Sequence, residues 1–152
     1  MRLILAAVGR AKPGPHLALQ QLYAERITWP LTILEVEEKR KLPAAERRER
    51  EGALLLARLP ERAHIIALDE RGKAPSSAEF AAMLGRWRDT GAETLAFLIG
   101  GADGHSEAVR ERASALLAFG PMTWPHLLVR GMLLEQLYRA QQILAGHPYH
   151  RE

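Results

Sequence analysis

The sequence contains no cysteine, few aromatic residues and no long apolar run. The absence of cysteine excludes disulfides, thiol nucleophiles and thiolate metal sites. No apolar stretch reaches the roughly 20 residues that a membrane span requires. The N-terminal run of residues 1–9 is too short for a signal sequence, and charged residues follow at once, so it is predicted to be a first strand. These absences predict a soluble cytoplasmic protein with no membrane contact.

Lysine is also scarce, because only Lys12, Lys39, Lys41 and Lys73 occur and arginine supplies most of the positive charge. The guanidinium group suits phosphate recognition. The net charge of +3 permits nucleic-acid binding without arguing strongly for it. The length of 152 residues, 47% of them hydrophobic, predicts one domain spanning residues 1–152, with a core that needs neither disulfides nor metal.

Apolar runs alternate with segments of helical periodicity along the whole chain. Strands are predicted at residues 2–8, 31–36, 64–69 and 94–99, with a brief strand at 119–126. Helices are predicted from residue 16 to the break at Trp29-Pro30, then at 43–58, 76–89, 106–118 and 127–145. A capping box of Ser76 and Glu79 begins the third helix. This alternation predicts an α/β fold, a mostly parallel sheet with helices on both faces.

The charges of the second helix form pairs four residues apart, Glu46 with Arg50 and Arg47 with Glu51. They are interpreted as a solvated helix face. RNA contact by the preceding basic residues 39–41 is the less favoured alternative.

Three segments follow the ends of predicted strands: Leu68-Asp69, Gly100-Gly101 and the loop 119–124. Ligands of open α/β sheets bind beyond the carboxyl ends of the strands, so these segments are candidates for one pocket. The spacing Gly100-Gly101-x-x-Gly104 matches neither the dinucleotide fingerprint nor a P-loop. Alone it is a weak signal, since a glycine pair often marks only a tight turn.

The C-terminal tail places Tyr149, His150 and Arg151 side by side. A terminus is usually frayed, but an ordered His150 could act as a general base. His147 and His150 have no evident third ligand, so no metal site is expected. His126, after Pro125, is either a structural histidine or part of the pocket rim.

Several motifs together resemble one family. They are Leu68-Asp69-x-x-Gly72-Lys73, Leu98-Ile99-Gly100-Gly101-x-x-Gly104, Met122-Thr123-Trp124-Pro125-His126-x-x-x-Arg130, Leu134-Glu135-Gln136-Leu137-Tyr138-Arg139-Ala140 and Pro148-Tyr149-His150. Their order and spacing resemble the RlmH family, bacterial 23S ribosomal RNA pseudouridine N3-methyltransferases of the SPOUT superfamily. The resemblance implies a C-terminal deep trefoil knot, S-adenosylmethionine bound in the knot, a homodimer, and a substrate in the large subunit or the whole ribosome.

The resemblance also implies roles for individual residues. The cofactor-binding positions are Leu68, Gly100, Phe119, Gly120, Pro121, Met122, Thr123 and Trp124, with Gly101 adjacent to them in a structural role. Tyr149, His150 and Arg151 from one subunit are expected to close over the pocket of the other, where His150 would orient the base or accept its proton. Arg130, Arg139 and His126 are candidates for substrate binding, and for the two arginines the alternative is a salt bridge with Glu135 or the partner subunit.

Two other classes of protein stay open at this point. One is a non-catalytic RNA- or ribosome-binding module on the same fold. The other is a monomeric flavodoxin-like nucleotide-binding domain without a knot, in which the tail is dispensable.

Overall fold

A five-stranded sheet forms the centre of the chain. The computed structural model describes residues 1–151, so Glu152, the last residue of the predicted domain, lies outside the described residues. The strands are β1 (Arg2–Val8), β2 (Leu31–Val36), β3 (His64–Lys73), β4 (Thr94–Ile99) and β5 (Ala115–Leu117). Their order is β2-β1-β4-β3-β5, and every pairing is parallel. All five carboxyl ends therefore lie at one edge of the sheet.

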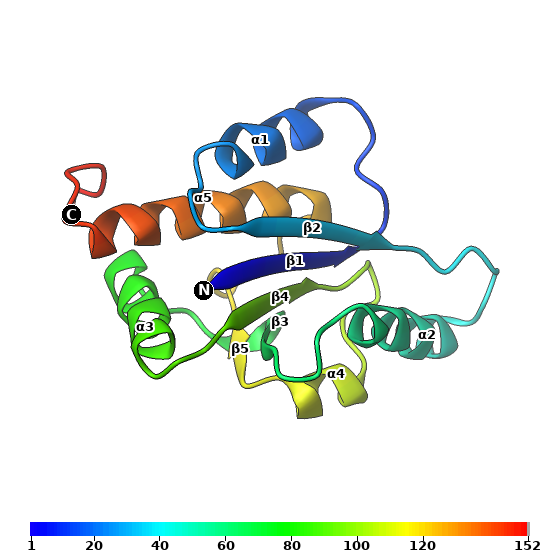
Figure 1. Cartoon of the computed structure of the whole chain (residues 1–152). Helices are drawn as coiled ribbons and strands as arrows, with labels where there is room; N and C mark the ends of the chain where they lie inside the picture. The colour runs from blue at the N-terminus through cyan, green and yellow to red at the C-terminus, as the bar shows by residue number, and fades with distance from the viewer. Residues whose placement is uncertain (152) are drawn as a thin grey trace.

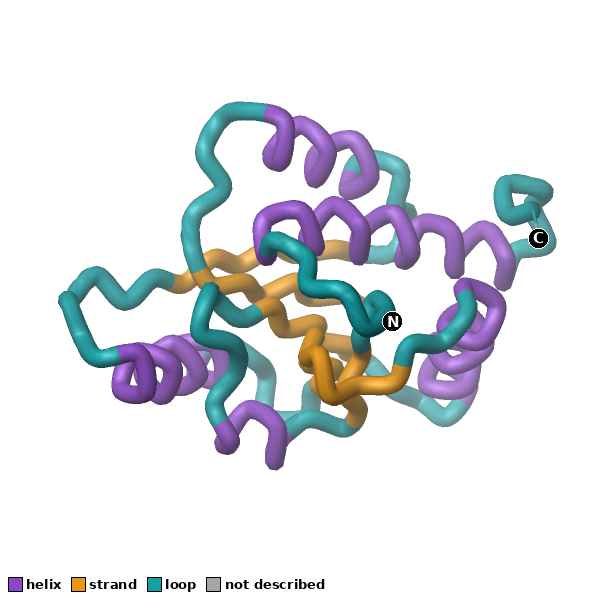
Figure 2. Tube along the Cα trace, turned by 180° about the vertical axis from the view of Figure 1, so that it is seen from behind, coloured by secondary structure: helices purple, strands orange, loops and turns teal. Residues whose placement is uncertain are grey.

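Helices cover both faces of the sheet (Figures 1 and 2). One face carries α1 (Pro15–Ala24), α3 (Ser77–Asp89) and α5 (His126–Leu144), and α5 packs against both of the others. The opposite face carries α2 (Ala44–Ala57) and α4 (Glu107–Arg112), which contact each other. The predicted α/β architecture is thereby confirmed.

The middle strand, β4, is buried along its entire length. Its sequence Thr-Leu-Ala-Phe-Leu-Ile has no polar alternation, which is typical of a strand covered on both faces. The sheet order differs from the flavodoxin order 2-1-3-4-5 because β4 lies between β1 and β3. This topology contradicts the flavodoxin-like alternative.

The predicted boundaries hold where local signals are strong. The Ser76 side chain accepts a hydrogen bond from the Glu79 backbone N–H, and the Glu79 side chain accepts one from that of Ser76, so the predicted capping box begins α3. Gly91 follows this helix with φ +90°, and Gly146 follows α5 with φ +71°. Both are left-handed conformations that favour glycine.

The predicted helix at residues 106–118 is wrong in its second half. Ser106 caps the helix as expected, but α4 ends at Arg112, and Ala115–Leu117 pair with β3 as the edge strand β5. The brief strand predicted at residues 119–126 is also wrong, since within the described residues this segment is a loop leading into α5. At residues 115–117 the pairing with β3 outweighs the helix propensity of the alanines and leucines.

Two further details differ from the prediction. Helix α1 ends at Ala24, several residues before Trp29-Pro30, and Leu22 on this helix is 44% exposed. On α2, Glu51 is not on a solvated face but is buried, and Arg50 forms its ion pair with Glu38. In residues 1–151 no helix combines the length and apolar character needed to cross a membrane.

Candidate functional site

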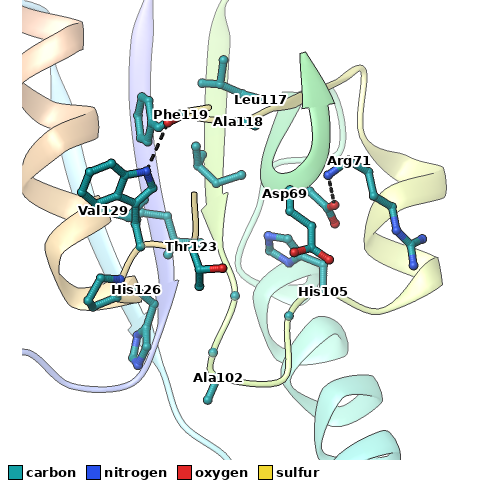
Figure 3. A pocket seen from close by; sticks show the side chains of 18 of the residues that line it. Asp69, Arg71, Ala102, His105, Leu117, Ala118, Phe119, Thr123, His126 and Val129 are labelled. Atoms are coloured by element: carbon teal, nitrogen blue, oxygen red, sulfur yellow. Dashed lines mark hydrogen bonds between the residues drawn. The ribbon is translucent and has the colours of Figure 1, made fainter. Parts of the chain in front are cut away.

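A cavity of about 660 Å³ opens at the carboxyl edge of the sheet, beyond the ends of β3, β4 and β5. Its size falls within the range of about 300–1,000 Å³ that small-molecule sites occupy. In Figure 3, Phe119, Val129 and His126 form one side of the cavity and Asp69 and His105 the facing side. The three predicted site segments therefore meet in one pocket. The lining includes every predicted cofactor position except Pro121.

The turn after β4 is closed by its own backbone. The Gly104 N–H donates to the Gly101 carbonyl at 3.0 Å, and Gly104 has φ +78°. A Cβ built on Gly100 would lie 3.0 Å from the Gly104 carbonyl carbon. A side chain at position 100 would therefore press on the backbone that closes the turn, so glycine is favoured there by the turn itself.

His105 holds this turn to the strand and was not identified from the sequence. Its side chain is almost completely buried, and its Nε2 lies 3.1 Å from the Leu98 carbonyl oxygen. Because a carbonyl can only accept, Nε2 carries the proton and Nδ1 is left as a free acceptor. Within the described residues Nδ1 has no partner. Burial lowers the pKa of His105, so the ring is neutral at pH 7. Its only sequence signal was a polar residue directly after the glycine turn.

The loop at residues 119–124 lines the cavity and has several backbone N–H groups without an acceptor in the described part of the protein. The hydrogen bonds among residues 1–151 include none donated by the backbone N–H groups of Gly120, Met122, Thr123 or Trp124. The loop is shaped by Gly120 at φ +92° and by the Trp124 indole N–H, which donates to the Phe119 carbonyl at 3.1 Å. Trp124 and Met122 line the cavity and are 40% and 72% exposed, so both remain accessible to solvent.

His126 occupies the first position of α5 at the rim of the pocket. Burial, followed by the positive charge of Arg130, lowers the pKa of this histidine. Its Nδ1 is buried and has no hydrogen-bond partner among the described residues. The position agrees with the pocket-rim alternative left open by the sequence.

Arg130 lies one helical turn further along α5, and its side chain is completely buried. Its guanidinium donates to Glu35 Oε2 at 2.6 Å and to the Val8 and Gly9 carbonyls at 2.9 and 2.8 Å. Burial alone raises the pKa of Glu35, but the Ala11 N–H and Arg130 outweigh it and the net shift is downward. Arg130 therefore holds α5 against β1 and β2. Substrate binding by this residue would require an accessible side chain, and in the structure the side chain is buried.

The tail packs against the second half of α5. Tyr149 Oη donates to Glu135 Oε1 at 3.1 Å, and Arg139 forms an ion pair with the same carboxylate. Burial and the hydrogen bond to Glu135 raise the pKa of Tyr149 to about 12, so its hydroxyl keeps its proton. Arg139 thus forms the salt bridge that was the alternative to substrate binding, and it also contacts His150 Nδ1 at 3.1 Å.

The tail and the pocket of one chain lie apart. His126 borders the pocket, and Arg139 follows it by thirteen residues of continuous helix, a rise of about 20 Å. Tyr149 and His150 contact the helix at and beyond Glu135. The structure does not bring the tail residues into the pocket of the same subunit.

The pocket lining contains as many cationic as anionic groups. The guanidiniums are those of Arg48, Arg71 and Arg110, and the carboxylates are those of Asp69, Glu70 and Asp103. Leu68, Ile99, Leu117 and Val129 add apolar surface. Among residues 1–151, no three His, Asp or Glu side chains gather in an arrangement suited to a metal ion. The site is suited to an organic ligand that carries both charges and an apolar part.

Comparison with known proteins identifies the class. A family model described as "Predicted SPOUT methyltransferase" matches residues 1–150. The SpoU methyltransferase AviRb from Streptomyces viridochromogenes has a similar fold, with a TM-score of 0.51 at 14% identity over 96% of this chain and 61% of that one. The chain belongs to the SPOUT methyltransferase family.

Within this family the similarity is to one kind of protein. The chain is 60% identical to "Ribosomal RNA large subunit methyltransferase H" of Rhodospirillum centenum and 58% identical to that of Paramagnetospirillum magneticum. Both alignments cover 99% of this chain and 99% of the relative. The resemblance stated from the sequence motifs is confirmed.

Proposed function

We propose that this chain is an S-adenosylmethionine-dependent methyltransferase of large-subunit ribosomal RNA, and that its acceptor atom is N3 of a pseudouridine in the 23S RNA. The observation that carries the proposal is a mixed-charge pocket at the carboxyl edge of a SPOUT-family chain. Identity of 60% to a large-subunit rRNA methyltransferase over 99% of both chains supports the same substrate class.

The residues of the pocket fit the cofactor. S-adenosylmethionine combines an adenosine, a sulfonium and an amino-acid end, so it needs apolar walls, hydrogen-bond donors for its carboxylate and carboxylates near its cationic groups. Leu68, Ile99 and Val129 line the cavity, and the free N–H groups of residues 120 and 122–124 are available as donors. The carboxylates of the lining favour the cationic end.

The proposed reaction exchanges one bond to N3 for another. The N3–H bond breaks and its proton leaves to bulk solvent, and the imide nitrogen would then form the bond to the methyl carbon as the donor's carbon–sulfur bond breaks and leaves a thioether. When bound, S-adenosylmethionine supplies the electrophilic methyl group. The protein must then orient the pseudouridine, exclude water and stabilise negative charge on the imide.

The tail residues are proposed to act in a homodimer. Because Tyr149 and His150 lie along α5, away from the pocket of their own chain, they can serve only the pocket of a partner subunit. Glu135 and Arg139 fix both side chains in place, and Arg151, exposed at the end of the described chain, is available to the imide oxygens. The deep trefoil knot and the cytoplasmic location stay part of this proposal.

A methyl-transfer assay tests the proposal. Ribosomes and large subunits that lack the modification are incubated with the protein and labelled S-adenosylmethionine, and the product nucleoside is identified. N3-methylpseudouridine is expected, whereas a methyl group on another atom contradicts the assigned acceptor. Absence of cofactor binding in calorimetry at millimolar concentration contradicts the enzyme and favours the non-catalytic RNA-binding module.

Deletion of residues 149–152 tests the tail. The truncated protein is expected to fold and bind the cofactor as the full chain does, and to lose turnover. If it stays fully active, the tail has no part in the reaction. A monomer in light scattering contradicts the action of the tail in a partner pocket.

A further inference from the structure

The pocket is lined by three arginines, and one of them is already engaged. Arg110 forms ion pairs with Asp69 and Glu107 and donates to the His105 carbonyl at 2.7 Å. Arg48 and Arg71 have no carboxylate within 4.0 Å in the part of the chain that the structure describes. The rim of the pocket thus offers two guanidiniums free to bind an external anion.

The backbone around Arg71 is fixed on both sides. The Arg71 N–H donates to Asp69 Oδ1 at 2.9 Å. A Cβ on the following Gly72 would lie 2.6 Å from the backbone of Leu116 and Leu117, so only glycine allows this close approach to β5. The motif Leu68-Asp69-x-x-Gly72 therefore holds the irregular end of β3, where the side chains of Glu70 and Arg71 are exposed. Figure 3 shows the Arg71 guanidinium directed away from the interior of the pocket.

Arg48 reaches the same rim from a different element. It lies on α2, on the opposite face of the sheet from α5, and is half-buried although it has no acidic partner. The two arginines that the family resemblance implied for substrate binding are engaged elsewhere, Arg130 inside the fold and Arg139 with Glu135. Arg48 and Arg71 are the guanidiniums at the pocket that remain for this task.

We propose that Arg48 and Arg71 bind the RNA phosphates that flank the target nucleotide when its base enters the pocket. The inference rests on the proposed function and names the surface through which its substrate is held. A base that is methylated at N3 must leave its pairing and enter the pocket from an unstacked strand. Its two flanking phosphates then stay at the rim, where a guanidinium can bind phosphate oxygens through two donors.

The test compares R48Q, R71Q and the double variant with R58Q. Arg58 lies at the end of the same helix α2, is exposed, forms no ion pair within the described residues and does not line the pocket. Its replacement removes the same charge without touching the proposed surface. Cofactor affinity is measured by calorimetry, and methylation of unmodified ribosomes is measured at several salt concentrations.

Each single variant is expected to raise KM for ribosomes about five- to ten-fold and to leave S-adenosylmethionine affinity unchanged. The slope of log kcat/KM against log salt should become shallower by about 0.7 for each arginine removed, as for a phosphate contact on a single strand. R58Q is expected to match the wild type in all three measurements. Variants that match R58Q overturn the proposal. Weakened cofactor binding also overturns it, because the arginine then holds the carboxylate of the methyl donor.

Direct binding separates this proposal from the proposed function. If the wild-type protein methylates no ribosome, the proposed function fails. The affinities of the variants for a single-stranded RNA oligonucleotide then show whether Arg48 and Arg71 bind phosphate. Weaker binding by R48Q and R71Q than by R58Q still supports a phosphate surface. Equal binding by all three variants overturns it.

Discussion

Replacing Arg130 by alanine separates a structural arginine from one that binds substrate. The side chain of Arg130 is 0% exposed and joins three segments that are distant in sequence: α5, the end of β1 and Glu35 on β2. Arg130→Ala leaves the Val8 and Gly9 carbonyls without these donors and Glu35 without its cation. The same change removes the packing of the long arginine stem.

The loss can be estimated from the burial of each partner. Breaking a buried charge pair typically costs about 3–5 kcal/mol. Glu35 keeps a 34% exposed side chain and can be hydrated, so the lower end, about 3 kcal/mol, is appropriate. For a domain of this size, 1 kcal/mol corresponds to a change in Tm of roughly 2–4 °C. Arg130→Ala should therefore lower Tm by about 6–12 °C. Arg130→Lys keeps the charge but loses the fork of donors, so its Tm should lie between the Tm of Arg130→Ala and that of the wild type.

Thermal unfolding followed by circular dichroism measures this loss, with Arg58→Ala as an exposed control expected to change stability by less than about 0.5 kcal/mol. The pKa of Glu35 is lower in the folded state than in the unfolded state. Its ion pair therefore stabilises the fold fully at pH values above the pKa of the unfolded state, and this stabilisation is lost as the pH falls through the pKa of the folded state. The difference in Tm between wild type and Arg130→Ala should thus narrow below pH ~4. An unchanged Tm combined with weaker RNA binding would refute the structural role.

Three further changes test the framework of the site. Gly72→Ala places a Cβ 2.6 Å from the Leu116 backbone and should cost about 1–3 kcal/mol in urea unfolding; an unchanged midpoint contradicts the close approach. His105→Ala removes the hydrogen bond to Leu98 and should weaken S-adenosylmethionine binding about five-fold in calorimetry, for about 1 kcal/mol. Because burial lowers the pKa of His105, wild-type stability should also fall as pH drops below ~6.5, and the variant should lack this fall. Burial raises the pKa of Glu51, so its ionisation lowers stability as pH rises; Glu51→Gln should raise Tm more at pH 8 than at pH 5, and an equal effect at both contradicts this.

The elements that the sequence predicted well are those whose signals are local. The capping box at Ser76 and Glu79 marks a helix start within four residues, and the all-apolar run at 94–99 marks a strand covered on both faces. The position of the pocket was also predictable. Loops that follow parallel strands must meet at one edge of the sheet, whatever the order of the strands.

The edge strand β5 shows where local signals fail. Residues 113–118 are Ala-Ser-Ala-Leu-Leu-Ala, which have good helix propensity. The structure ends α4 before them and pairs Ala115–Leu117 with β3 across the close approach at Gly72. That pairing depends on residues of β3 that lie more than forty positions earlier, so the residues around β5 alone do not predict the strand.

The burial of charged side chains could not be predicted from their neighbours in the sequence either. Glu51 reads as one more acid in a charged helix, yet it is buried behind the turn that contains Gly101. Arg130 reads as a free cation on the last helix, and its partner Glu35 precedes it by 95 residues. Whether a charged residue faces RNA or the interior is decided by contacts between distant segments, and these are formed only when the sheet is assembled.

The hydrogen bonds of the tail bear on the role that the sequence left open for His150. A guanidinium can only donate, so its contact with Arg139 requires an unprotonated Nδ1 and places the ring proton on Nε2. Tyr149, with a pKa raised to about 12, likewise keeps its proton. In the proposed partner pocket the His150 Nε2–H and the Arg151 guanidinium are then available as donors, while the Tyr149 hydroxyl donates to Glu135 and holds the tail in place. Two donors suit the carbonyl oxygens of an imide that gains negative charge as it loses its N3 proton. The geometry therefore favours an orienting and charge-stabilising tail over one that removes the proton.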